Sequence, residues 1–246
     1  MIVQKDLPII KKDLMMGRVV VGSDFHVPFQ DNKAVDCFID YIADKQPEVV
    51  VIAGDLLDFY KLSKYVKGPG RDPIEEIKIA RDILGAVRDK VPYADIYYTI
   101  GNHESRLENY VYTKAPDLAG MVGSFYDLVG CKELNIVPCH RVEFNKNELV
   151  VSHGKFVGQR AGQSALKELL AHPFKIGICG HTHRLIKLIY RMLGIKRIQI
   201  ENGHLGTMNP HYVLDPDWQQ GFSEVLFDNW EALRANILEI EDGRII

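Results

Sequence analysis

The stretch PEVVVIAGDLLD (residues 47–58) is the clearest indication of the fold class. It begins with a continuous run of mostly β-branched apolar residues and then changes abruptly to Gly54 and Asp55. A strand that is apolar on both faces is typical of a parallel sheet buried between two layers. The glycine permits a tight turn at the carboxyl end of the strand, where α/β proteins bind their ligands. We therefore expect a buried strand over 47–55 that leads directly into a functional loop.

Two similar segments flank this strand in the sequence. Residues 17–24 (GRVVVGSD) and 94–103 (ADIYYTIGNH) are also apolar runs that end in small and polar residues. Between these runs, residues 32–46 and 74–90 have apolar positions at helical spacing. This alternation of strands and helices predicts a largely parallel sheet with helices on its outside.

The second half of the chain has a different pattern, with short apolar runs and one clear helix over 160–172. The strands predicted there cover 134–138, 141–145, 148–153, 175–180, 184–190, 196–201, 222–228 and 235–240. We expect this half to form a second sheet that is mostly antiparallel. The predicted fold class is therefore α/β, with two mixed β-sheets face to face and helices outside them in four layers (α-β-β-α).

Composition restricts the class of protein. Of 246 residues, 46% are hydrophobic and 26% are charged, which is close to the globular average and excludes fibrous and disordered chains. The net charge of −3 gives no global basic field for nucleic acid. No apolar run is long enough for a membrane span, and the N-terminus lacks the apolar core of a signal peptide. Four scattered cysteines without CxxC spacing favour a reducing, cytoplasmic compartment.

One domain is predicted over 1–246, because the candidate site residues come from both halves of the chain. Within it, residues 1–15 are interpreted as an N-terminal arm, with an edge strand or a dimer contact as alternatives. Residues 59–73, which include the turn-rich sequence KGPGRDP, are interpreted as a cap loop. The oligomeric state stays open, with a homodimer among the alternatives.

Polar residues stand at five predicted strand ends and form one candidate ligand set. They are Asp24, His26, Asp55, Asn102, His153, His181 and His183. Seven oxygen and imidazole ligands are too many for one tetrahedral ion, but they suit two ions with five or six ligands each that share a carboxylate. Because no thiolate is among them, they favour manganese, iron, zinc or nickel over a structural zinc site. Two such ions, about 3.5–4 Å apart, would activate a bridging water and hold a phosphoryl group.

These motifs, in this order, resemble those of the calcineurin-like metallophosphoesterase superfamily. The family pattern is D-x-H, G-D-x-x-D, G-N-H-D/E, a later His beside a small residue, and G-H-x-H, and all five blocks occur between residues 24 and 183. Residues 202–222, with an Asn-Gly turn and the string WQQGF, look closer to small bacterial and bacteriophage-type members. The resemblance implies that one metal is held by Asp24, His26 and His183, that the other is held by Asn102, His153 and His181, and that Asp55 bridges them.

The resemblance also implies a catalytic mechanism. A metal-bound hydroxide would attack a phosphate mono- or diester, and His103, which is not a ligand, would assist the leaving group. Asp58 would orient His103. Two divalent ions are implied, manganese first, with iron, zinc, nickel or magnesium as alternatives. From the residues alone, we expect Arg106 to point at a substrate phosphate, with an ion pair to Glu108 or Asp117 as the alternative.

The substrate is less clearly indicated. Residues 59–71 and 184–197 are basic and lack acidic residues, and Lys155 and Arg160 follow His153. If these segments surround the metals, they would suit a nucleic acid, although a solvated surface is the alternative. A nuclease-type phosphodiesterase therefore stays an alternative function, and a non-catalytic, metal-dependent scaffold is a second one.

Two further residues, Glu104 and His204, are not assigned to the predicted site. Glu104 is interpreted as an acidic residue that favours the dipole of the following helix. His204 is kept outside the predicted site, with an approach to it as the minor alternative.

Overall fold

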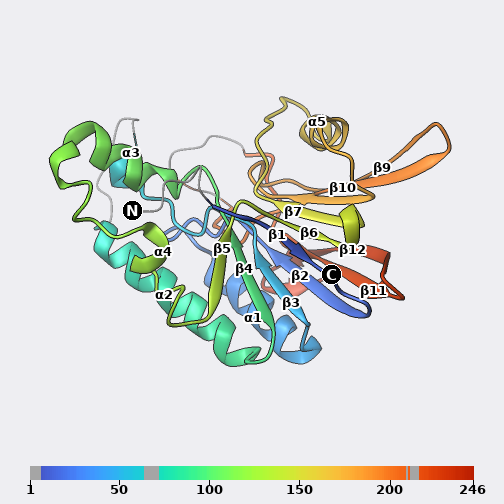
Figure 1. Cartoon of the computed structure of the whole chain (residues 1–246), viewed down its shortest axis with the longest axis horizontal. Helices are drawn as coiled ribbons and strands as arrows, with labels where there is room; N and C mark the ends of the chain where they lie inside the picture. Colours follow the sequence, from blue (N-terminus) through green and yellow to red (C-terminus); the bar gives the residue numbers. More distant parts are fainter. Residues whose placement is uncertain (1–6, 64–71, 209, 211–215) are drawn as a thin grey trace.

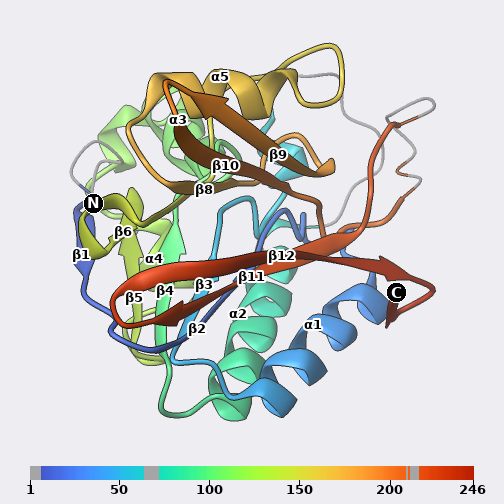
Figure 2. The same cartoon turned by 90° about the vertical axis from the view of Figure 1, so that its right-hand side faces the viewer.

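The computed structural model describes residues 7–63, 72–208, 210 and 216–246. Two β-sheets face each other, with helices on their outer sides (Figures 1 and 2). The seven-stranded sheet has the order β13 (Arg244–Ile245), β12 (Glu231–Glu241), β11 (Gly221–Asp228), β2 (Gly17–Gly22), β3 (Val49–Ile52), β4 (Asp95–Thr99) and β5 (Ile136–Cys139). The six-stranded sheet has the order β1 (Ile9–Lys12), β6 (Arg141–Phe144), β7 (Leu149–Ser152), β8 (Ile176–Cys179), β10 (Ile195–Asn202) and β9 (Leu185–Met192).

The continuous apolar strands are explained by burial on both faces. In β2, Val19 and Val21 join the apolar cluster between the two sheets, whereas Val20 joins the cluster beneath the helices. In β3, Val51 joins the cluster between the sheets and Ile52 joins the cluster beneath the helices. The strand therefore needs an apolar residue at every position, as the sequence pattern predicts.

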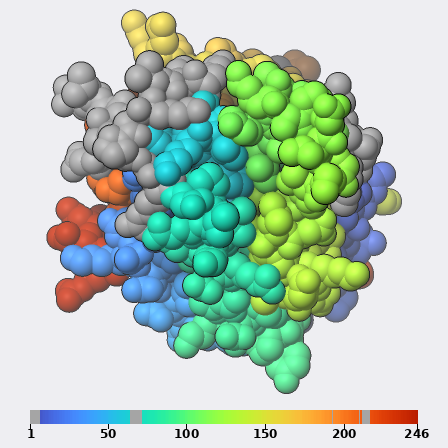
Figure 3. All heavy atoms as spheres, turned by 90° about the vertical axis from the view of Figure 1, so that its left-hand side faces the viewer, coloured from blue at the N-terminus to red at the C-terminus, as the bar shows by residue number. Residues whose placement is uncertain are grey.

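Helices cover the outer faces of the sheets. The helices α1 (Asn32–Lys45) and α2 (Pro73–Lys90) pack on the seven-stranded sheet, and they lie on one face of the molecule beside the segment that holds α3 (Ser105–Lys114) and α4 (Phe125–Leu128) (Figure 3). The side chain of Asp31 caps α1 by accepting hydrogen bonds from two backbone N–H groups. The helix α5 (Gln163–Ala171) packs on β8, β9 and β10 of the other sheet (Figure 1). Short 3₁₀ helices occur at Tyr60–Leu62, Pro116–Leu118 and Asn145–Asn147.

The strand directions confirm the parallel part of the first sheet and correct the prediction for the second. The neighbours β2, β3, β4 and β5 are parallel. In the six-stranded sheet, however, β1–β6, β7–β8 and β8–β10 are parallel, and only β6–β7 and β9–β10 are antiparallel. The prediction of a mostly antiparallel second sheet is therefore wrong. The reason is that α5 forms a crossover from β7 to β8, and the β9–β10 hairpin folds back so that β10 lies beside β8.

The C-terminal strands also differ from the expected organisation. Instead of extending the second-half sheet, β11 pairs with β2 and so joins the first-half sheet. Within the predicted arm, Ile9–Lys12 form β1 beside β6, and within the predicted cap loop, α2 begins at Pro73. Residues 1–6 and 64–71 of these two segments lie outside the described residues. Among the helices of the described part, none has the length and apolar character needed to cross a bilayer.

Candidate metal centre and catalytic site

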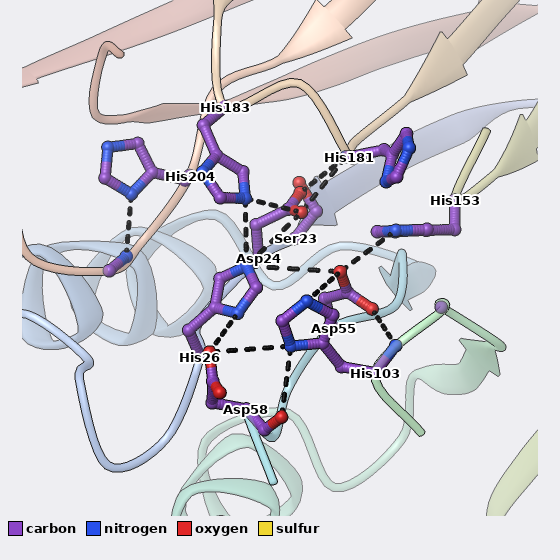
Figure 4. A network of polar contacts seen from close by, with 12 residues as sticks. Ser23, Asp24, His26, Asp55, Asp58, His103, His153, His181, His183 and His204 are labelled. Carbon is purple, nitrogen blue, oxygen red and sulfur yellow. Dashed lines mark hydrogen bonds and ion pairs between the residues drawn. The ribbon is translucent and has the colours of Figure 1, made fainter. Parts of the chain in front are cut away.

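The predicted site residues converge where strand ends from both sheets meet (Figure 4). Loops after β2, β3 and β4 contribute from the seven-stranded sheet, and loops after β7 and β8 contribute from the six-stranded sheet. The residues brought together are Asp24, His26, Asp55, Asp58, Asn102, His103, Arg106, His153, His181 and His183.

The backbone is strained at most of the candidate ligands. The angle φ is 55° at Asp24, 52° at His26, 49° at Asp55, 73° at His181 and 60° at His183. A non-glycine residue in this left-handed region costs about 1–3 kcal/mol and persists only where the surrounding structure fixes it. Such strain gathers at functional sites, and here it coincides with the side chains that converge on one another.

Two glycines of the motifs make room for the carboxylates. A β-carbon on Gly101 would overlap the side chain of Asp55, and one on Gly180 would overlap that of Asp24. Glycine is therefore required at both positions because a carboxylate approaches the backbone closely.

The first group of candidate ligands consists of Asp24, His26 and His183. The Nε2 atoms of His26 and His183 lie 2.9 Å apart, and Oδ1 of Asp24 lies 3.8 Å and 3.4 Å from them. The carboxylate of Asp24 is fixed by the backbone N–H of His181, which donates to it at 3.0 Å. These imidazole and carboxylate groups would hold a divalent cation, which would act there as a Lewis acid.

The second group consists of Asp55, His153 and His181, with Asn102 beside it. Nε2 of His153 lies 3.2 Å from Oδ2 of Asp55 and 3.1 Å from Oδ1 of Asn102. Nδ1 of His153 faces the carbonyl oxygen of Ala53 at 2.8 Å, so it can donate there and leave Nε2 free for a cation. Oδ2 of Asp55 is also 4.0 Å from Nε2 of His26, which places this carboxylate between the two groups.

The electrostatics of the cluster fit divalent cations. Burial opposes protonation of His26 and His153, but the nearby aspartates outweigh it and raise both pKa values to about 10. Burial also opposes ionisation of Asp24 and Asp55, yet the surrounding histidines lower the pKa of both carboxyl groups. The site thus draws positive charge toward two buried carboxylates, and divalent cations would take the place of the imidazole protons.

His103 lies at the rim of this cluster and is held by Asp58. Its Nδ1 lies 3.1 Å from the backbone carbonyl oxygen of Asp58 and 3.5 Å from Oδ2 of the same residue. Its Nε2 lies 3.8 Å from Oδ2 of Asp55, and 14% of the side chain is exposed. The arrangement fits the orienting role expected of Asp58, with the backbone carbonyl as a second acceptor. Asp58 also contacts Nδ1 of His26 at 3.3 Å, so it links the two imidazoles.

Arg106 contacts Asp58 rather than the expected partners Glu108 or Asp117. Its Nη1 donates to the carbonyl oxygen of Asp58 at 2.6 Å and to Oδ1 at 2.9 Å, and its Nη2 donates to Nε2 of His103 at 2.9 Å. Arg106 therefore forms an ion pair, as the alternative predicts, but with Asp58 instead of Glu108 or Asp117. A guanidinium has five N–H donors, so others remain for a substrate phosphate, and that role stays a prediction.

Glu104 has a structural role that its sequence position conceals. Its side chain is buried, and Oε2 accepts from the backbone N–H groups of Asp55 (3.1 Å) and Gly101 (2.9 Å). Oε1 accepts from the N–H of Leu56 (2.9 Å) and the hydroxyl of Tyr98 (2.7 Å). Glu104 therefore ties together the two loops that carry Asp55 and His103. Glu104 does stand at the N-cap of α3, as the sequence predicts, but its carboxylate also accepts from four donors outside the helix, a role that the helix-dipole interpretation does not include.

His204 is a second residue that the sequence did not place in the site. It is 1% exposed and its ring stacks on His183, with 5.3 Å between centroids and 27° between planes. Trp218 contacts both rings edge to face. In the sequence, only the Asn-Gly turn before His204 and the string WQQGF could have indicated this contact. Neither has the residue spacing typical of metal ligands.

The basic segment 184–197 lies mostly away from the metal cluster. Arg184 is largely buried and pairs with Asp217 at 2.8 Å. The remainder belongs to the β9–β10 hairpin, which projects from the body (Figure 1). Because β10 runs parallel to β8, its first residues lie opposite the end that leads to His181. The expectation that Lys196 and Arg197 surround the metals is therefore wrong.

Comparison with known proteins agrees with this site. The family model of the calcineurin-like phosphoesterases matches residues 17–185, which include every predicted site residue. The Gene 54 protein of Mycobacterium phage L5 is 30% identical over 255 residues, which covers 94% of this chain and 96% of that protein. The Gene 54 protein of Mycobacterium phage D29 is 27% identical with the same coverage.

Solved structures of similar fold include YfcE, a phosphoesterase from E. coli (TM-score 0.49, 16% identity, 93% of this chain and 96% of that chain). Another is Vps29 from Entamoeba histolytica complexed with zinc (TM-score 0.48, 18% identity, 90% of this chain and 91% of that chain). The match of the family model over most of the chain, together with the phage L5 relative, shows that this protein belongs to the calcineurin-like phosphoesterase family, whose members use divalent metals.

Proposed function

We propose that the chain is a hydrolase that cleaves phosphate mono- or diesters with two divalent cations, manganese first among them. The observation that carries this proposal is the set of three overlapping, largely buried His/carboxylate groups around Asp55, one of which includes His103 at the rim. Asp24, His26 and His183 would hold one cation. Asn102, His153 and His181 would hold the other, with Asp55 between them. Cations bound there would lower the pKa of a water and neutralise charge on a phosphoryl group.

The residues around this centre supply the remaining steps. His103 stands at the open rim, where a protonated Nε2 could donate to a leaving oxygen. Asp58 holds the ring by accepting from Nδ1, which fixes its orientation. Arg106 contacts both residues, and its guanidinium is positioned to bind a phosphate oxygen.

The test uses aryl phosphate esters. Wild-type protein with added manganese should hydrolyse a mono-aryl or bis-aryl phosphate, and chelation should stop the reaction. Asp55→Ala and His181→Ala should abolish turnover, whereas His140→Ala, at an exposed histidine outside the cluster, should leave it unchanged. Turnover that survives in both cluster variants would contradict the proposal.

A nucleic-acid phosphodiester is the alternative substrate. It is favoured by Lys155 and Phe156, which follow His153 and whose ammonium and ring lie 5.0 Å apart, and by the exposed Arg160. A panel of single-stranded DNA, RNA, cyclic nucleotides and the two aryl esters would decide. Lys155→Glu should selectively weaken cleavage of a nucleic acid while sparing the aryl esters.

A metal-dependent scaffold is the alternative to an enzyme. Absence of turnover on the whole panel, with manganese, nickel, magnesium and zinc each tested, would favour it. The rim position of His103 supports catalysis, because a docking surface does not require an oriented imidazole there. We further propose that the chain is one domain, because both sheets supply the site. A cytoplasmic location is proposed from the four cysteines, which are all free.

A further inference from the structure

His183 and His153, one from each group of ligands, are held in different ways. Nδ1 of His153 has the carbonyl oxygen of Ala53 as a partner, the usual arrangement for a metal-binding histidine. Nδ1 of His183 is buried and has no hydrogen-bond partner among the described residues. Nε2 of His183 faces Asp24 and His26 at the cation position, so on the Nδ1 side the ring depends on contacts other than a hydrogen bond.

That contact is with two rings. His204 stacks on His183, and Trp218 meets it edge to face with 4.3 Å between centroids and 77° between planes. His204 and Trp218 also contact each other at 5.4 Å (Figure 4 shows His204 beside His183). The ring of His183 is thus held by packing against two rings, whereas the ring of His153 is held by a hydrogen bond to the backbone.

The position of His204 is itself fixed by the backbone. Its N–H donates to the carbonyl oxygen of Gln219, and its carbonyl oxygen accepts from Gly221, both at 3.2 Å. In the side chain, Nδ1 accepts from the N–H of Gly206 at 3.2 Å. The ring therefore stands in one orientation before any cation binds.

We propose that His204 and Trp218 are positioning residues that set the cation affinity of the group formed by Asp24, His26 and His183. The inference rests on the proposed metal-dependent function. Loss of the stacked ring would free His183 to rotate and would weaken that group alone, because the other group has the backbone carbonyl of Ala53. The two cation sites would then respond differently to the same substitution.

Two substitutions separate the ring from its nitrogen. His204→Asn retains an acceptor for the N–H of Gly206 but removes the ring, whereas His204→Phe retains a ring but removes the acceptor. Trp218→Leu removes the second ring at a half-buried position without changing the backbone contacts of His204. His140→Ala, at an exposed histidine outside the cluster, is the control. Thermal unfolding and circular dichroism establish that each variant is folded.

The readout is calorimetric titration of metal-stripped protein with manganese. We expect two sites in the wild type and a loss of about 10- to 100-fold in affinity at one of them in His204→Asn and Trp218→Leu. His204→Phe should bind both cations with affinities close to wild type, even though loss of the Gly206 contact lowers its melting temperature. In His183→Ala, adding His204→Asn should cause no further loss.

The inference is overturned if His204→Asn leaves both affinities unchanged, if it weakens both sites equally, or if His204→Phe is as weak as His204→Asn. A wild-type chain that binds no cation would instead contradict the proposed function itself. The two failures are therefore distinguishable in one titration series.

Discussion

Nη2 of Arg106 lies 2.9 Å from Nε2 of His103. The nitrogen that would face a leaving oxygen therefore accepts a hydrogen bond from a guanidinium, and the ring proton lies on Nδ1, toward Asp58. For His103 to act as an acid, Nε2 must lose this partner and carry a proton. We infer that a substrate phosphate draws the guanidinium away from His103 and so couples substrate binding to release of the imidazole.

Removing the guanidinium tests its contact with the substrate phosphate. Arg106→Gln should lower kcat/KM by about 10- to 100-fold, because a hydrogen bond to a charged group contributes about 1.5–3 kcal/mol. Arg106→Lys keeps the charge but loses the planar arrangement of donors, so its kcat/KM should lie between those of wild type and Arg106→Gln. Steady-state kinetics on an aryl phosphate measure the effect, with Arg234→Gln, at an exposed arginine of β12, as control. A kcat/KM equal to wild type in Arg106→Gln would refute the role of this arginine.

The acid role of His103 predicts a dependence on the leaving group. His103→Ala should lower kcat by about 10²- to 10⁴-fold for esters with poor leaving groups, and by much less for a nitrophenyl ester. Metal content, measured by elemental analysis, should not change. An equal loss for all leaving groups would show that His103 acts in some other way.

Glu104 should be essential for the stability of the site loops. Glu104→Ala removes the acceptor of three backbone N–H groups and one hydroxyl, and each buried group left unpaired costs about 1–3 kcal/mol. Four such groups cost at least about 4 kcal/mol together, so we expect the melting temperature to fall by at least about 8 °C, at about 2–4 °C per kcal/mol for a chain of this size. The exposed Glu239→Ala is the matched control. A melting temperature equal to that of the control would contradict the role assigned to Glu104.

Glu76 should make stability depend on pH. Burial raises the pKa of its carboxyl to about 8, against the opposing hydrogen bond from the N–H of Phe59. A folded pKa above the unfolded one means that the protonated acid stabilises the fold, an effect complete below pH of about 4.5 and lost as pH rises to about 8. Glu76→Gln mimics the protonated acid at every pH. The melting temperature of this variant should therefore rise relative to that of wild type as the pH increases from about 4.5 to about 8. A difference independent of pH would contradict the prediction.

Much of the candidate site was predictable because its ligands follow strands directly. Asp24, Asp55 and His181 each stand within three residues of a strand end, so locating the strand locates the ligand. The parallel order of β2, β3 and β4 then brings the loops together, as the apolar pattern indicated.

The remainder depended on contacts that no local pattern encodes. Glu104 resembles any acidic residue before a helix until its four donors from other loops are known. His204 reaches His183 only because β10 lies beside β8, and this pairing follows from how the β9–β10 hairpin folds back. The parallel pairing of β8 with β10 also makes most of the six-stranded sheet parallel, whereas the run of short strands predicts a mostly antiparallel sheet. Propensity predicts that strands exist, but the order of strands is set by packing of the whole chain.

Two cations at the Asp55 cluster should be required for phosphoester hydrolysis. The most direct test strips the protein of metal, adds manganese stepwise, and measures bound ions and turnover of a bis-aryl phosphate in the same samples. We predict no turnover without metal, a stoichiometry of two ions per chain, and activity that appears only as the second equivalent binds. Turnover in the stripped protein, or full activity with one equivalent, would contradict the requirement for two cations.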